Sequence, residues 1–114
     1  MHEYALAQAM VSRVLETARE RKASRVRAVT VSVGELAGVE PDFLKHAYEM
    51  VRVGTLLEGA TLEVQVVPAR YLCPGCGRRF GRGEVLRCEG CDRPARLEGE
   101  GEEILLRAVE LEVP

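Results

Sequence analysis

The chain has 114 residues, of which 46% are hydrophobic and 30% are charged, and its formal net charge is −2. This composition is typical of a globular protein, and the length allows one modest core with a small appendage. No apolar run approaches the length of a membrane-spanning helix. The slightly negative charge argues against general nucleic-acid binding. The start, Met-His-Glu-Tyr, lacks the basic and apolar segments of a signal peptide, so we expect a cytoplasmic protein.

The first half of the chain predicts two helices with a strand between them. Apolar residues recur at three- and four-residue spacing over residues 3–22, which predicts an amphipathic helix. Alternation over 27–33 predicts a half-buried strand. Pro41 favours the start of a second helix and Gly54 favours its end. The apolar face of this second helix is expected to contain Phe43, Leu44, Ala47, Tyr48, Met50 and Val51.

The second half predicts two more strands on either side of a cysteine-rich insertion. Residues 61–67 alternate again, and 104–113 form a final strand after a flexible acidic return at 98–103. The apolar face of the final strand is expected to contain Leu105, Val109, Leu111 and Val113, with Arg107 interrupting it. The fold class is therefore α+β, a two-layer arrangement with two helices on a small sheet of about three strands. We expect one domain from residues 1–69 with 98–114, and a second from 70–97.

The insertion contains the four cysteines of the chain, arranged as two Cys-x-x-Cys pairs with eleven residues between them: Cys73, Cys76, Cys88 and Cys91. Two pairs at this spacing can place four thiolates around one tetrahedral Zn²⁺, and the glycines beside them permit tight loops. Zinc would fold a lobe too small for its own core. The alternative is two disulfides in a secreted domain, which a reducing compartment disfavours. A redox Cys-x-x-Cys usually occurs singly.

The N-terminus is a second candidate metal site. The amine of Met1 and the amide nitrogen of His2 can close one chelate ring, and that amide with the His2 imidazole can close a second. Three nitrogens then lie in a plane, with Glu3 or another ligand at the fourth position. Such donors suit Ni²⁺ or Cu²⁺ rather than tetrahedral Zn²⁺. A histidine at this position also occurs without any metal, and His46 fits a packing or surface role in the second helix.

Three features together resemble the HypA/HybF family of hydrogenase nickel-incorporation proteins. They are the opening Met-His-Glu-Tyr-Ala-Leu-Ala, the segment Val-Gly-Glu-Leu-Ala-Gly-Val-Glu-Pro-Asp-Phe-Leu at 33–44, and the double Cys-x-x-Cys followed by a Gly/Glu-rich strand. The resemblance covers the whole chain. It implies a nickel metallochaperone that works with a nickel-handling GTPase and delivers Ni²⁺ to the large subunit of a NiFe hydrogenase.

The same resemblance implies roles for individual residues. His2 would be the principal nickel ligand, helped by the Met1 amine and Glu3, and the cysteines would hold structural Zn²⁺. Glu35 and Glu40, in the signature segment, would either orient the site or a partner or serve the structure of the loop. The implied partners are the GTPase and the hydrogenase large subunit, without nucleic acid or membrane, and the chain would be a monomer or a homodimer.

Two other interpretations remain at the level of sequence. One is a zinc-ribbon adaptor that binds nucleic acid or protein through Arg78, Arg79, Arg82, Arg87, Arg93 and Arg96. The other is a zinc-stabilised subunit of an enzyme complex. Residues 70–97 contain seven arginines and three acidic residues, whereas the rest has nine basic and fifteen acidic residues. This contrast fits either steering of a partner or two solvated surfaces. No nucleophile–base pair or phosphate loop is recognisable, so we expect a protein that is not an enzyme.

Overall fold

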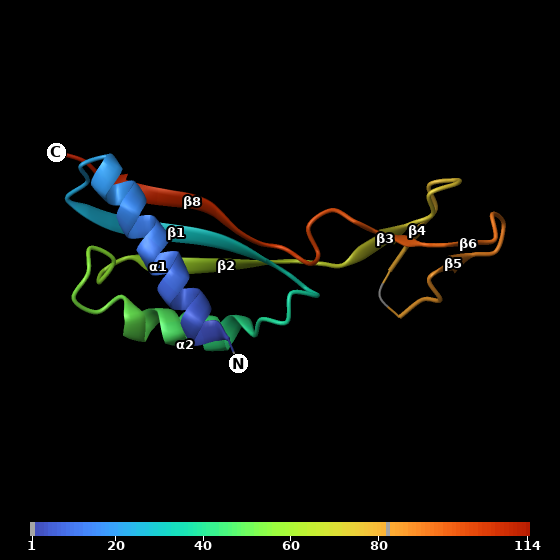
Figure 1. The fold of residues 1–114 in the computed structure, drawn as a ribbon, viewed down its shortest axis with the longest axis horizontal. Coiled ribbons are helices and arrows are strands. Elements are labelled where there is room, and N and C mark those ends of the chain that lie inside the picture. Colours follow the sequence, from blue (N-terminus) through green and yellow to red (C-terminus); the bar gives the residue numbers. More distant parts are fainter. Residues whose placement is uncertain (1, 82) are drawn as a thin grey trace.

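The computed structural model describes residues 2–81 and 83–114. The molecule is elongated, measuring 59 × 28 × 16 Å, with an α/β core at one end and a cysteine lobe at the other (Figure 1). The core consists of α1 (Glu3–Glu20), β1 (Arg25–Gly34), α2 (Pro41–Val51), β2 (Thr61–Val67) and β8 (Ile104–Glu112). The cysteine lobe consists of β3 (Arg70–Leu72), β4 (Arg79–Phe80), β5 (Arg87–Cys88), β6 (Arg93–Pro94) and β7 (Arg96–Glu98).

Helix α1 follows the predicted periodicity. Its inner side contains small and medium apolar residues, and Ala7, Val14 and Ala18 are fully buried. The helix ends two residues earlier than predicted, because Lys22 adopts a left-handed backbone with φ of 55°. Arg21 is the C-cap residue, and the amide of Ala23 donates to the carbonyl of Ala18 at 2.9 Å.

The core sheet has the order β2–β1–β8, with β1 parallel to β2 and antiparallel to β8. The central strand β1 carries the interior of the core, since Val29, Val31 and Val33 are each 1% exposed and cluster with buried residues of both helices. The helices pack against each other, α2 also contacts β2, and α1 contacts β8. The predicted two-layer α+β fold with an inserted cysteine lobe is confirmed.

One prediction for α2 is wrong. Leu44, Ala47 and Tyr48 are buried as expected, but Phe43 and Met50 are 64% and 54% exposed. In a two-layer core only one side of α2 meets other elements, so its buried stripe is narrower than the apolar content of the sequence suggested. Phe43 and Met50 follow the helical period, but they lie on the outer flank of α2.

The face predicted for the final strand is confirmed at Val109 and Leu111 and is wrong at Leu105 and Val113. Along β8, Ala108 pairs with Thr30 while Leu106 pairs with Val31, so Arg107 is an extra residue that produces a β-bulge. The bulge reverses the alternation, which puts Leu105 opposite Ser32. The residues of β8 that pack on the core are Ile104, Val109 and Leu111, and Val113 is an exposed residue beyond the strand.

Candidate metal centre

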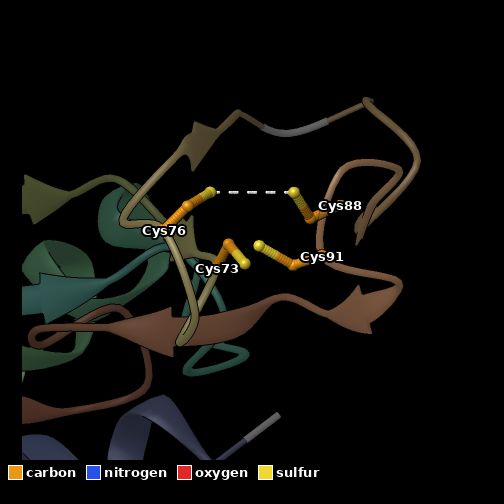
Figure 2. Close-up of side chains that lie close together, drawn as sticks. All are labelled: Cys73, Cys76, Cys88 and Cys91. Carbon is orange, nitrogen blue, oxygen red and sulfur yellow. Dashed lines mark hydrogen bonds between the residues drawn. The ribbon is translucent and has the colours of Figure 1, made fainter.

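The four cysteines lie together at the far end of the elongated molecule, with their sulfur atoms pointing toward one another (Figure 2). All four Sγ atoms lie within 4.8 Å of one another, and those of Cys76 and Cys88 are 3.8 Å apart. A tetrahedral Zn²⁺ with Zn–S bonds of about 2.3 Å requires sulfur separations of about 3.8 Å. The Cys76–Cys88 separation has this value, and the limit of 4.8 Å makes the cluster compact enough to surround a single ion.

The first Cys-x-x-Cys pair is held by backbone hydrogen bonds within its own turn. The amide of Gly75 donates to Cys73 Sγ at 3.4 Å, and the amide of Gly77 donates to the Cys73 carbonyl at 2.9 Å. Gly77 needs a φ of 78°, which an L side chain rarely adopts. The glycine after the second cysteine of this pair is thus required by the turn that points both sulfurs inward.

The second pair uses a side-chain contact that the sequence analysis did not identify. Arg87 donates from Nε and Nη2 to Asp92 Oδ1 at 3.2 and 2.8 Å, and also to the Asp92 carbonyl at 3.1 Å. Asp92 has a φ of 50° and lies in the turn between β5 and β6. Its contact with Arg87 therefore closes this turn around Cys88 and Cys91. The sequence does contain a signal for this contact, namely a basic and an acidic residue five positions apart that flank a Cys-x-x-Cys pair.

The electrostatics of the cluster fit a cation. Hydrogen bonds from the backbone N–H of Cys76 and then of Gly75 lower the pKa of Cys73 to about 6. Hydrogen bonds with Cys76 and Cys73, together with burial, raise the pKa of Cys91 to about 12. Four adjacent thiols cannot all ionise without a positive charge between them, and Zn²⁺ provides that charge. The donor set consists of four soft sulfurs, of which those of Cys73 and Cys88 belong to buried residues, Cys91 is half-buried and Cys76 is exposed.

Two of the three predicted nickel residues, His2 and Glu3, lie at the start of α1. Met1 lies outside the described residues. His2 is exposed and is the N-cap residue of α1, and its carbonyl accepts a 2.9 Å hydrogen bond from the amide of Leu6. Glu3 is buried, and its Oε2 accepts a hydrogen bond from the amide of Glu40 at 3.0 Å. The start of α1 is thereby attached to the loop that precedes α2.

Glu35 and Glu40, which the sequence also singled out, accept hydrogen bonds from backbone amides. Glu40 is the N-cap of α2, with Oε1 accepting from the amide of Asp42 at 3.3 Å. Glu35 Oε1 accepts from the amide of Ala69 at 2.8 Å. His46 is exposed on α2, as a surface role requires.

The arginines of the cysteine lobe are partly engaged with neighbours, and Arg82 lies outside the described residues. Arg78 lies over the Phe80 ring at 4.5 Å, Arg79 pairs with Glu98 at 3.3 Å, and Arg87 pairs with Asp92. The two ion pairs offset part of the positive charge that an adaptor for nucleic acid would need. Among the helices that the structure describes, none is both long and apolar enough to cross a membrane.

A two-layer α+β core with an inserted four-cysteine cluster defines a small metal-binding protein. The family model described as "Hydrogenase/urease nickel incorporation, metallochaperone, hypA" matches residues 1–111. The chain is 37% identical over 112 residues to the hydrogenase maturation factor HypA of Nitrosospira multiformis, covering 97% of each. It is 39% identical over 113 residues to HypA of Archaeoglobus fulgidus, covering 99% of this chain and all of that protein.

Solved structures agree with the fold. The solution structure of the nickel metallochaperone HypA from Helicobacter pylori has a TM-score of 0.70 at 23% identity, with full coverage of both chains. A second HypA solution structure has a TM-score of 0.76 at 22% identity, covering 100% of this chain and 98% of that one.

The chain therefore belongs to the HypA family and is a nickel metallochaperone of hydrogenase maturation. Family membership confirms the resemblance seen in the sequence, and it confirms the expectation of a protein that handles metal without catalysing a reaction. It favours the metallochaperone over the adaptor interpretation.

Proposed function

We propose that this chain binds Ni²⁺ at its N-terminus through the imidazole of His2, the amine of Met1 and a donor from Glu3. It then passes the ion to the large subunit of a NiFe hydrogenase. The observation that carries the proposal is that His2 is exposed at the very start of α1, in a chain of a nickel-handling family. A ligand that must release its ion to another protein has to be accessible.

The position of His2 before the helix also leaves its backbone available. The first amides of a helix have no intrahelical acceptor, so the His2 amide nitrogen is not part of the α1 ladder. Once deprotonated, this nitrogen can join the amine and the imidazole in two fused chelate rings. Three nitrogens in one plane suit Ni²⁺, whereas the cysteine cluster suits Zn²⁺.

The cysteine cluster complements this site in the proposal. Cys73, Cys76, Cys88 and Cys91 hold one structural Zn²⁺, which shapes residues 70–97 into a zinc-binding domain. Residues 1–69 with 98–114 form the nickel-binding domain. Support comes from the sulfur spacing and from the closed donor set, which leaves no coordination position for a substrate.

The partners in the proposal are a nickel-handling GTPase and the hydrogenase large subunit. Delivery between proteins requires neither nucleic acid nor a membrane, and the net charge of −2 is consistent with that. We place the chain in the cytoplasm, since thiolate ligands persist in a reducing compartment.

Isothermal titration with Ni²⁺ tests the nickel site. The native chain should bind about one ion, as expected for one planar nitrogen site. His2→Ala should abolish binding while zinc content stays unchanged. One residue added before Met1 should do nearly the same, because the amine becomes an amide. Binding should weaken as pH falls, since protons compete for the amine, the amide and the imidazole.

His46→Ala is the matched control, because His46 is the other histidine and is likewise exposed. This variant should bind nickel like the parent. If His2→Ala binds nickel as tightly as the parent, or if nickel displaces zinc from the cysteines, the N-terminal site is wrong.

A further inference from the structure

The core and the cysteine lobe are joined by two linkers, residues 68–69 and 99–103, and one short segment of the core contacts the chain at both crossings (Figure 1). This segment is 34–36, at the end of β1. The amide of Glu35 donates to the carbonyl of Val67, the last residue of β2 before the first linker, at 2.8 Å. The amides of Gly34 and Leu36 donate to the carbonyls of Glu103 and Gly101 of the second linker at 2.7 and 2.8 Å.

The side chain of Glu35 adds a contact where the first linker leaves the sheet. The pairing of β2 with β1 ends at Val67, and the following Pro68 has no amide hydrogen. The next amide, that of the buried Ala69, donates instead to Glu35 Oε1 at 2.8 Å. A buried amide without an acceptor is costly, so this carboxylate determines where the linker can run.

The second linker approaches so closely that side chains are excluded. A Cβ on Gly34 would overlap the carbonyl oxygen of Gly101 and lie 2.6 Å from that of Glu100. A Cβ on Gly101 would lie 3.1 Å from Ala69 Cα, so the two linkers touch each other at this point. The bulge residue Arg107 adds a further contact, since it donates to Ser32 Oγ at 3.0 Å and pairs with Glu100.

The same loop reaches the start of α1. It ends at Glu40, whose amide donates to the carboxylate of Glu3, next to His2. Residues 34–40 therefore contact the base of the cysteine lobe at one end and the N-terminal end of the core at the other.

We propose that Glu35 is a positioning residue, which holds the cysteine lobe at a set orientation to the core and thus to the N-terminal end of α1. The hydrogen-bond acceptor is the essential feature, and Gly34 provides the close approach of the second linker. A protein partner that contacts both ends of the molecule then binds the core and the lobe as one rigid unit. This inference goes beyond the proposed nickel ligands and does not depend on them.

The test uses the full chain with its metal and compares Glu35→Ala with Glu35→Gln, which keeps an acceptor oxygen. In Glu35→Ala, exchange of the Ala69 amide should accelerate about tenfold or more. Nitrogen-15 relaxation should show the cysteine lobe tumbling separately from the core, with zinc content and the core melting temperature close to those of the parent. Glu35→Gln should restore both amide protection and joint tumbling.

Glu102→Ala is the matched control, since Glu102 is an exposed glutamate in the second linker, and it should behave like the parent. Gly34→Ala provides an independent arm. Its methyl group must displace residues 100–101, so residual dipolar couplings should report a changed orientation of the lobe. The proposal is overturned if Glu35→Ala keeps joint tumbling and Ala69 protection, if Glu35→Gln is as impaired as Glu35→Ala, or if Gly34→Ala leaves the orientation unchanged.

Discussion

The two ends of this molecule are stabilised in different ways. Among the described residues, fourteen buried side chains form one cluster in the core, contributed by both helices, the sheet and the connection between α2 and β2. The buried cluster of the cysteine lobe contains three residues, and two of them are the cysteines Cys73 and Cys88. Burial of apolar area can stabilise the first region, but the second has too little of it. We therefore expect the lobe to depend on a bound metal, and the core to be stable without one.

The largest expected effect is loss of the metal. Cys73→Ala, or removal of Zn²⁺ with a strong chelator, should unfold the lobe, because structural zinc contributes on the order of 10 kcal/mol in small domains. Limited proteolysis should then cut within 70–97 and leave the core intact. Metal analysis should find one Zn²⁺ per parent chain. Protein prepared without chelator that contained no zinc, with its cysteines oxidised in pairs, would contradict stabilisation of the lobe by zinc.

The converse change should damage the core alone. Leu44→Ala removes a fully buried side chain and should lower the free energy of unfolding of the core by about 2–5 kcal/mol. Zinc content and the sulfur environment should not change, because the metal stabilises the lobe independently of the core. Thermal denaturation with parallel metal analysis measures both. The adjacent Phe43→Ala is the control, and a similar loss there would show that the outer flank of α2 is covered in solution.

A smaller effect is expected from one buried hydroxyl. Tyr48 Oη donates to the Ala60 carbonyl at 2.8 Å, and Arg52 donates to the same oxygen at 3.0 Å. Since the carbonyl keeps one donor, Tyr48→Phe should cost only about 1 kcal/mol in unfolding free energy. Chemical denaturation can resolve this, with the exposed Tyr4→Phe as the comparison. Equal losses in the two variants would mean that the hydrogen bond contributes nothing.

The smallest expected effect concerns the charge contrast between the two regions. Although the lobe is richer in arginine, several of these side chains have acidic partners, such as Asp92 for Arg87 and Glu98 for Arg79. Filter binding at physiological salt should therefore detect no DNA or RNA affinity, since such affinity comes from counterion release by free cations. Tight, salt-sensitive binding would show that the lobe has a second role as a nucleic-acid surface.

The sequence by itself determined the elements that depend on local pattern. Helical periodicity predicted α1, alternation predicted β1 and β2, and Pro41 marked the start of α2. The two Cys-x-x-Cys pairs predicted that four sulfurs would meet, and the structure brings them within 4.8 Å of one another. These features repeat over a few residues, or depend on turn geometry within one motif, so neighbours along the chain carry the information.

Only the tertiary structure decided which apolar residues are covered and where distant segments meet. Nothing near Phe43 or Met50 in sequence shows that the outer flank of α2 has no neighbour. The bulge at Arg107 arises from its pairing with β1, more than seventy residues earlier, and the contact of Glu35 with Ala69 joins segments thirty-four residues apart. Such contacts depend on how complete elements pack, because a local pattern records the period of burial but not the partner that produces it.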